Sequence, residues 1–243
     1  MKIGVYGIQF NEKKITIFQD LFNYLKEFKE LNNVSIYAPF YEILSQGLND
    51  IDAFDQFSSF EEVKSFDYML CLGGDGAILD TLCIVKDSGV PVLGINTGRL
   101  GFLSSISTDT VENPLRSVLS GEYTIDARNT LKLASKSAVF GSTNYALNEV
   151  TVQKKDSSSM MIIHAYVDDE YLNSYWADGL IISTPTGSTG YNLSCSGPII
   201  MPGSDVFVIT PIAPHNLNVR PLIIPSNKTI KLKLEGRDDE CLV

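Results

Sequence analysis

The sequence is poor in the residues that build metal centres and disulfide frameworks. Its 243 residues include only two histidines and four cysteines, and the cysteines are scattered without the short spacings of metal ligands. We therefore predict no metal site made by the protein alone. Two of the cysteines lie inside apolar runs, where we expect reduced, buried thiols. His164 is expected to have a structural role on a strand.

Basic residues are also in the minority. The chain has 19 Lys and Arg against 29 Asp and Glu, which gives a formal net charge of −10. Such a field repels polyanions, and no Lys/Arg cluster with interleaved aromatic residues occurs, so nucleic acid is not expected as a partner. A nucleotide ligand would have to be bound by local backbone N–H groups together with a metal ion.

Long apolar runs are missing as well. No stretch approaches the ~20 apolar residues that span a bilayer, and the chain opens with the strand-like segment Lys2–Tyr6 instead of a signal peptide. We therefore expect no membrane association and a cytoplasmic location. A hydrophobic content of 44% over this length is enough for one large domain or two small ones.

The first part of the chain alternates short apolar runs with helical periodicity, which predicts an α/β domain over residues 1–122. One helix has an apolar face with Phe18 and Phe22, and another follows Gly76 and is expected to end at Gly89. A polar connection over residues 104–124 is expected to contain one short helix. The predicted strands are Lys2–Tyr6, Val34–Tyr37, Tyr68–Leu72 and Val92–Ile95, the last of which is expected to be buried.

From about Arg128 the pattern changes to β-type runs broken by turns, which predicts a β-rich, sandwich-like domain over residues 123–243. Residues Lys154–Ser159 are expected to form a solvated hairpin tip. The predicted strands are Leu131–Ala134, Ala146–Val152, Met160–Val167, Leu180–Ser183, Val206–Pro211 and Thr229–Leu234.

One candidate site is the glycine turn Gly73–Gly76, which surrounds Asp75. Glycines let the backbone approach a phosphate chain closely at a helix start, where N–H groups and the helix dipole favour anions. The spacing alone is more typical of a tight turn with an N-capping aspartate. Neither a P-loop nor a Gly-x-Gly-x-x-Gly motif is present.

A second candidate site follows Asp178-Gly179. After a short strand, the segment Thr184–Ser194 supplies small hydroxyl residues and glycines that can hydrogen-bond a purine or ribose, and Tyr191 supplies a ring for stacking. As composition alone, the segment is also an ordinary Ser/Thr/Gly turn.

Taken together, these segments resemble the NAD kinase family in its ATP-dependent bacterial form. Five matches occur in the family's order and cover most of the chain from about residue 68 onward. They are Gly73–Gly76, Asn96–Leu103, Asn148–Glu149, Asp178–Gly179 with Thr184–Ser194 and Gly197–Pro198, and Thr210–His215 with Arg220–Pro221.

The resemblance implies a reaction and roles for these residues. ATP, carrying Mg²⁺ or another divalent cation, would donate its terminal phosphoryl group to the 2′-hydroxyl of the adenosine ribose of NAD. Asp75 would be the general base, beside the phosphate-binding glycines Gly73, Gly74 and Gly76. Asn148 and Glu149 would contact ribose and base, and Asp178 the far half of the dinucleotide. The remaining pocket positions implied are Thr186, Thr189, Gly190, Tyr191, Asn192, Ser194 and Ala213.

The resemblance also implies a homo-oligomer, most simply a tetramer built through the second domain, with Ala213 reached from a neighbouring subunit in some members. The apolar runs Val206–Ile209 and Leu222–Ile224 suggest such a contact surface. The alternative is that these runs fill the core of one sandwich.

Some positions depart from the family's pattern. Ala77 stands where Thr is usual, Gly190 where Ala is usual, and Cys195-Ser196-Gly197 where a Gly-Gly pair is common. These small-for-small changes bear on the shape of the pocket. The chain ends at Val243, earlier than members usually do, so it is either a short member or a truncated chain.

Two other functions are compatible with parts of the pattern. One is a lipid or sugar-phosphate kinase of the same glycine-aspartate type, which Asn148-Glu149 and the Thr184–Ser194 segment disfavour. The other is a non-catalytic dinucleotide-binding sensor, which the intact Asp75 disfavours.

Overall fold

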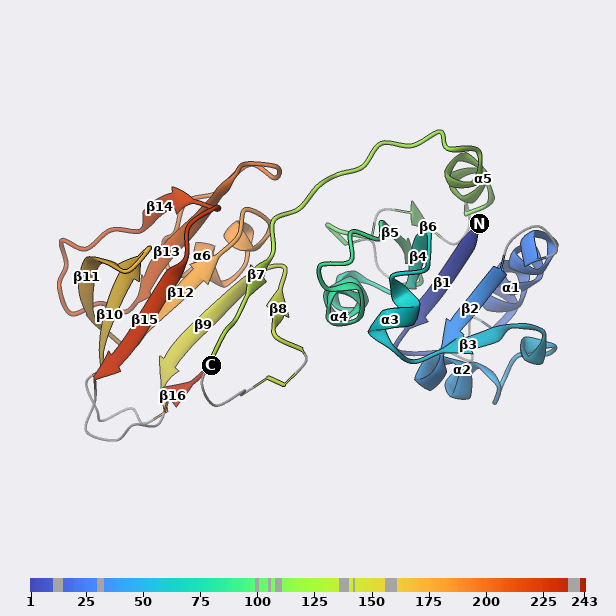
Figure 1. Ribbon diagram of the computed structural model, residues 1–243, viewed down its shortest axis with the longest axis horizontal. Coiled ribbons are helices and arrows are strands. Elements are labelled where there is room, and N and C mark those ends of the chain that lie inside the picture. The colour runs from blue at the N-terminus through green and yellow to red at the C-terminus, as the bar shows by residue number, and fades with distance from the viewer. Residues whose placement is uncertain are drawn as a thin grey trace. The chain divides into compact units, whose positions relative to one another are not determined.

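The computed structural model describes residues 1–10, 15–29, 33–98, 101–104, 106–107, 111–135, 140–141, 143–155, 161–235 and 241–243. Contacts along the chain group these residues into two compact units, 1–125 and 126–243 (Figure 1). The sequence placed this boundary between residues 122 and 123. Each unit has a hydrophobic core of its own.

The first unit is built on a six-stranded parallel sheet with the order β3-β2-β1-β4-β5-β6. Its central strands are almost entirely buried, as is typical of parallel sheets covered by helices. The strands are β1 (Lys2–Gly7), β2 (Asn33–Tyr37), β3 (Asp55–Phe57), β4 (Tyr68–Leu72), β5 (Val92–Asn96) and β6 (Ile106–Ser107).

In the described residues a helix follows each of these strands except β5. The predicted apolar face of the first helix is confirmed, because Phe18 and Phe22 are buried in the core. None of the helices in the described ranges is long and apolar enough to cross a membrane. The helices are α1 (Ile15–Lys29), α2 (Ala38–Leu44), α3 (Phe60–Val63), α4 (Asp75–Val85) and α5 (Glu112–Ser120), with a 3₁₀ turn η2 over Ile51–Ala53.

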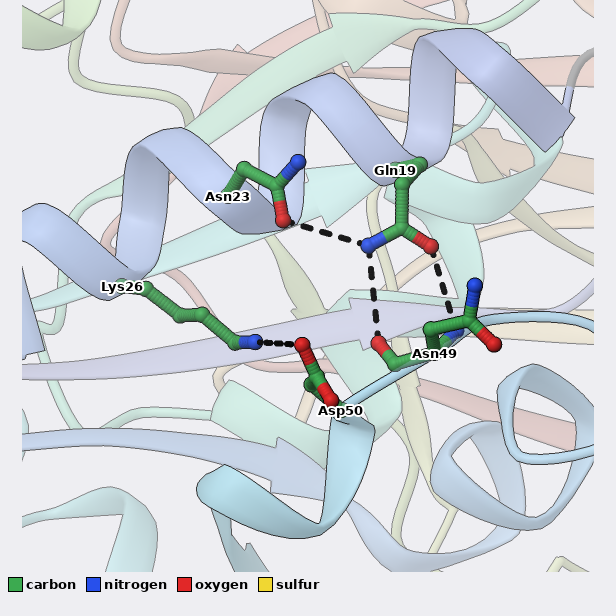
Figure 2. Close-up of polar contacts among 5 residues, drawn as sticks. All are labelled: Gln19, Asn23, Lys26, Asn49 and Asp50. Atoms are coloured by element: carbon green, nitrogen blue, oxygen red, sulfur yellow. Dashed lines mark hydrogen bonds and ion pairs between the residues drawn. The ribbon is translucent and has the colours of Figure 1, made fainter.

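Polar contacts fasten α1 to the loop before η2 (Figure 2). The amide of Gln19 donates to the backbone carbonyl of Asn49 at 3.4 Å and accepts from its N–H at 3.1 Å. Two turns further on, Lys26 Nζ lies 2.9 Å from Asp50 Oδ2. Asp50 adopts a left-handed backbone conformation with φ 55°, which costs conformational energy for a residue with a side chain. The contacts from Gln19 and Lys26 stabilise this turn.

The order of the strands determines where a ligand would bind in this unit. The chain adds β2 and β3 on one side of β1 and then returns to add β4, β5 and β6 on the other, so the order reverses between β1 and β4. Open α/β sheets bind ligands beyond the carboxyl ends of the strands at such a reversal. The glycine turn follows directly on Leu72, the last residue of β4, and therefore lies at this position.

The second unit contains two antiparallel sheets and a short two-stranded ribbon (Figure 1). The sheets have the orders β14-β13-β12-β9-β16 and β11-β10-β15, and residues of both sheets form one core, as in a sandwich. The strands are β7 (Leu131–Lys132), β8 (Tyr145–Ala146), β9 (Glu149–Lys154), β10 (Met161–Val167), β11 (Glu170–Ala177), β12 (Gly179–Ser183), β13 (Val206–Ile212), β14 (Leu222–Pro225), β15 (Ile230–Glu235) and β16 (Cys241–Leu242).

Three expectations about elements were wrong. Helix α4 ends at Val85, because Lys86 takes a positive φ of 48° and stops the helix before Gly89. Val92 is partly exposed, because β6 pairs only with the last two residues of β5 and leaves the start of β5 at an edge. The run Ala146–Val152 is divided between β8 and β9.

Candidate active site

The three glycines of the glycine turn differ in their surroundings. Packing requires a glycine at position 73, whereas positions 74 and 76 have free space beside the backbone. A Cβ on Gly73 would lie 2.4 Å from the Cβ of Ala77, so the first turn of α4 has no room for it. A Cβ on Gly74 or Gly76 would meet nothing within 4 Å. The turn is therefore fixed at Gly73 and accessible at the other two glycines.

Asp75 is the first residue of α4, and its carboxylate accepts three backbone hydrogen bonds. The N–H of Phe102 donates to Oδ2 at 2.8 Å, and the N–H groups of Leu103 and Ser104 donate to Oδ1 at 2.9 and 3.1 Å. Burial acts to raise the pKa of Asp75, but the three N–H donors outweigh it and the pKa is lowered. The carboxylate is ionised at neutral pH. The N-cap of α4 is Gly74, so the interpretation of Asp75 as an N-capping residue is wrong.

Asn96, at the end of β5, holds the loop that supplies these donors. Its buried amide nitrogen donates to the carbonyl and hydroxyl oxygens of Ser104 at 3.3 and 3.1 Å, while its Oδ1 accepts from the N–H of Gly98 at 2.7 Å. The sequence assigned no role to Asn96. The only sequence feature that could have indicated this role is the position of a polar residue at the end of a predicted buried strand. Arg99 and Leu100 of the same motif lie outside the described residues.

In the second unit, the turn after β12 packs directly on the backbone of Asn148. The N–H of Thr184 donates to the Asn148 carbonyl at 2.9 Å, and a Cβ on Gly187 would lie 2.1 Å from that same oxygen. The structure therefore brings the Asn148-Glu149 pair and the Thr184–Ser194 segment together, although 35 residues separate the start of one from the start of the other.

Glu149 presents a carboxylate oxygen without a partner to this cluster. Among the residues that the structure describes, none forms a hydrogen bond with the buried Oε2. A Cβ on Gly190 would lie 3.5 Å from it. Burial raises the pKa of Glu149. An unpaired buried acceptor costs free energy that a ligand's hydroxyl or amine could recover.

The Thr184–Ser194 segment separates into residues that hold its shape and residues that it exposes. It forms a 3₁₀ turn, η4 (Thr186–Thr189), and a short helix, α6 (Tyr191–Ser194). Thr186 is half-buried and accepts a hydrogen bond from Arg128 Nη1 at 3.3 Å. The exposed pocket candidates are Thr189, Gly190, Tyr191 and Ser194.

Asn192, in contrast, faces inward. Its amide nitrogen donates to the carbonyls of Ser188 and Pro198 at 2.9 and 3.0 Å, and its Oδ1 accepts from Thr210 Oγ1 at 2.6 Å. The side chain is completely buried. Asn192 was expected to line the dinucleotide pocket. Its buried amide uses both N–H donors and one acceptor position within the unit, and these bonds hold the segment together.

Asp178 and Ala213 lie together at the other end of β12. The N–H of Asp178 donates to the carbonyl of Ile212, the residue before Ala213, at 2.9 Å. The five residues of β12 rise about 3.3 Å each, so roughly 16 Å of strand separates this pair from the turn at Thr184. Within one chain, the structure does not bring Asp178 and Ala213 next to Glu149. Ala213 is exposed and adopts a strained left-handed φ of 44°.

Asp178 also has an ion-pair partner that the sequence missed. Lys154 Nζ lies 2.7 Å from Asp178 Oδ1, and the lysine side chain is only 17% exposed. Lys154 is thus not part of a solvated tip, and residues 156–160 of that expected tip lie outside the described residues. His164 fits its expected structural role, because its two ring nitrogens lie 2.7 Å from Ser174 Oγ and 2.9 Å from Glu235 Oε2.

Family models identify both units. The model described as the ATP-NAD kinase N-terminal domain matches residues 12–123, and the one described as the ATP-NAD kinase C-terminal domain matches residues 147–243. The chain belongs to the NAD kinase family. The predicted fold, an α/β domain followed by a β-rich domain, is confirmed as the two-domain architecture of this family.

Individual members of the NAD kinase family match the whole chain. The NAD kinase of Flavobacterium psychrophilum is 47% identical and that of Cytophaga hutchinsonii 44% identical, each over 100% of this chain and 83% of the relative. Yeast NADH kinase complexed with NADH superposes with a TM-score of 0.84 at 27% identity, covering 99% of this chain and 70% of that one. An Archaeoglobus fulgidus NAD kinase in complex with ATP gives 0.71 at 25% identity, covering 100% and 86%.

Proposed function

We propose that this chain transfers the terminal phosphoryl group of ATP to the 2′-hydroxyl of the adenosine ribose of NAD, giving NADP and ADP. The observation that carries the proposal is the Asp75 carboxylate. It is ionised and held by three backbone N–H groups beside two open glycines, in a chain whose two units both match NAD kinases. The solved NADH and ATP complexes of relatives support the choice of substrates.

In the proposed reaction, the 2′-oxygen forms a bond to the γ-phosphorus while the bond to the bridging oxygen of ADP breaks. Such a transfer needs positioning and charge neutralisation more than covalent chemistry by the protein. Gly74 and Gly76 let the phosphates approach the N-terminus of α4, where free N–H groups and the helix dipole favour anions. Asp75 accepts the hydroxyl proton.

We propose that the metal enters as part of the substrate, Mg²⁺–ATP. The described residues contain no group of three His, Cys, Asp or Glu side chains that could hold a metal ion. Magnesium fits this arrangement, because it keeps several waters and binds largely through substrate phosphates. When bound, it would neutralise the charge that develops on the phosphates.

For the dinucleotide, we propose that Glu149, Thr189, Gly190, Tyr191 and Ser194 contact one half. Asp178 and Ala213, about 16 Å away along β12, would contact the other half or the dinucleotide of a second chain. We therefore also propose a homo-oligomer, a tetramer, in which two chains complete one pocket. The runs that first suggested a contact surface support this weakly, because Phe207, Val208 and Ile209 are buried in their own unit while Ile223 is exposed.

The direct test is to incubate the purified chain with NAD, ATP and Mg²⁺ and to measure NADP with an NADP-specific dehydrogenase. Formation of NADP that depends on all three components is expected. Binding of NAD without NADP formation would favour the non-catalytic sensor instead. Phosphorylation of a diacylglycerol or sugar phosphate, with NAD untouched, would favour the other kinase class.

A further inference from the structure

Gly101 lies against the carboxylate of Asp75 with no room for a side chain. A Cβ built on Gly101 would lie 2.2, 2.5 and 2.7 Å from Oδ1, Cγ and Oδ2 of Asp75, and these are the three atoms nearest to it. Gly101 is not among the described residues with a positive φ. Its side chain is therefore excluded by the carboxylate and not by backbone strain.

The hydrogen bonds of Asp75 are distributed unequally over its two oxygens. An ionised carboxylate offers about four acceptor positions, two on each oxygen. Oδ1 accepts from both Leu103 and Ser104, whereas Oδ2 accepts from Phe102 alone. With these described donors in place, one acceptor position is left, and it is on Oδ2.

We propose that the segment Gly101–Ser104 is a backbone cradle that fixes the Asp75 carboxylate with the free acceptor position of Oδ2 toward the attacking hydroxyl, and that Gly101 is a positioning residue. This rests on the proposed kinase function. The hydroxyl proton is hydrogen-bonded to Oδ2 in the ground state. It passes to Oδ2 as the 2′-oxygen bonds to phosphorus and ADP leaves, and from there to solvent. Because the cradle also stabilises the ionised carboxylate, Asp75 orients the hydroxyl first and accepts the proton late.

The first test compares two alanine substitutions in the same loop. Gly101→Ala places a methyl group against the carboxylate, whereas a Cβ on Gly98 would meet only Asn96 Oδ1, at an ordinary 3.8 Å. We expect Gly101→Ala to lower kcat by about 10- to 100-fold, the scale of a small misplacement of a reacting group. We expect NAD KM and calorimetric NAD affinity to stay within about two-fold, and Gly98→Ala to resemble the parent. Equal losses in both variants, or parental kcat in Gly101→Ala, would overturn the proposal.

The second test is a double-mutant cycle that includes Asp75→Ala, which removes the carboxylate. Gly101→Ala should lower the melting temperature and kcat of the parent but change neither in the Asp75→Ala background, because nothing is left to displace. A folded double variant would support the cradle even if Gly101→Ala alone did not fold. Equal thermal losses in both backgrounds would refute it. If the parent makes no NADP, the proposed function fails. The melting temperatures of the four proteins in the cycle still show whether Gly101 contacts the Asp75 carboxylate as proposed.

Discussion

Asn192 Oδ1 accepts a hydrogen bond of 2.6 Å from Thr210 Oγ1, and this bond joins the short helix α6 to β13 inside the second unit. Both side chains are completely buried. A residue that the family resemblance places in the dinucleotide pocket is therefore part of the internal structure of the segment that presents Tyr191 and Ser194.

Asn192→Ala should accordingly destabilise the second unit. The substitution leaves the carbonyls of Ser188 and Pro198 and the hydroxyl of Thr210 without their buried partner. Each such unsatisfied group costs about 1–3 kcal/mol, so we expect the free energy of unfolding to fall by at least that amount. Urea unfolding, with the exposed Ser194→Ala as control, measures it. An Asn192→Ala variant of parental stability that binds NAD weakly would instead support a direct ligand contact.

Asp75→Asn should lower turnover by about 10²- to 10⁴-fold, the usual scale for loss of a general base, with NAD affinity retained. The variant also places an NH₂ group against backbone N–H donors, so a lower melting temperature should accompany the loss. Initial rates of NADP formation and calorimetric NAD binding check the two parts separately. Turnover within a few-fold of the parent would remove Asp75 from the chemical step.

Tyr191→Ala should weaken NAD binding more than it slows the chemistry. Tyr191 is 37% exposed and lies at the start of α6. Base–aromatic stacking contributes about 1–3 kcal/mol, so calorimetry should show a corresponding loss of affinity. Leu193→Ala is the matched control, because Leu193 lies two residues further along and is exposed to a similar degree, 44%. Equal losses in the two variants would argue against stacking.

Glu149 gives a prediction about pH. Burial raises its pKa above the ordinary value of 4.5, so the charged form destabilises the folded state. This cost is absent well below the ordinary pKa, appears as the pH rises through the raised pKa and is complete above it. Glu149→Gln should therefore melt higher than the parent at pH 7 and lose that advantage as the pH falls toward 4, while it binds NAD more weakly. A variant less stable than the parent at every pH would contradict the account.

The separation of Asp178 from Glu149 leads to a prediction about assembly. If two chains complete each pocket, light scattering at micromolar concentration should give four times the chain mass of 26.8 kDa. Mixing inactive Asp178→Asn and Glu149→Gln chains after subunit exchange should restore part of the activity, because hybrid pockets then contain one intact copy of each residue. A monomer with full activity would show that one chain builds its site unaided.

The sequence predicted best where local signals are strong. Strand β4 was predicted to its actual ends, because an apolar run meets glycines at a sharp boundary. The end of α4 was predicted wrongly, because glycine is the usual helix terminator and nothing local indicates that Lys86 takes a positive φ.

In the candidate site, too, features with a local sequence signal were predicted and long-range contacts were not. The glycine turn around Asp75 is evident from residue type and order, but the hydrogen bonds of the Asp75 carboxylate come from residues 27 to 29 positions away, which no local pattern reveals. The internal hydrogen bonds of Asn192 were not predicted for a related reason, because its partner Thr210 lies 18 residues away on another element. Lys154 was assigned to solvent because its ion pair with Asp178 crosses between two strands.

The separate cores of the two units change what a stability measurement on this chain means. One core is formed within residues 3–115 and the other within residues 152–224, so the cooperativity of unfolding belongs to each unit and not necessarily to the chain. A two-state analysis, which assumes a single transition, does not hold automatically for such a protein. Gly101 and Asn192 belong to different units, so we expect substitutions at the two positions to act on different unfolding transitions, and their free energies should not be added on one scale.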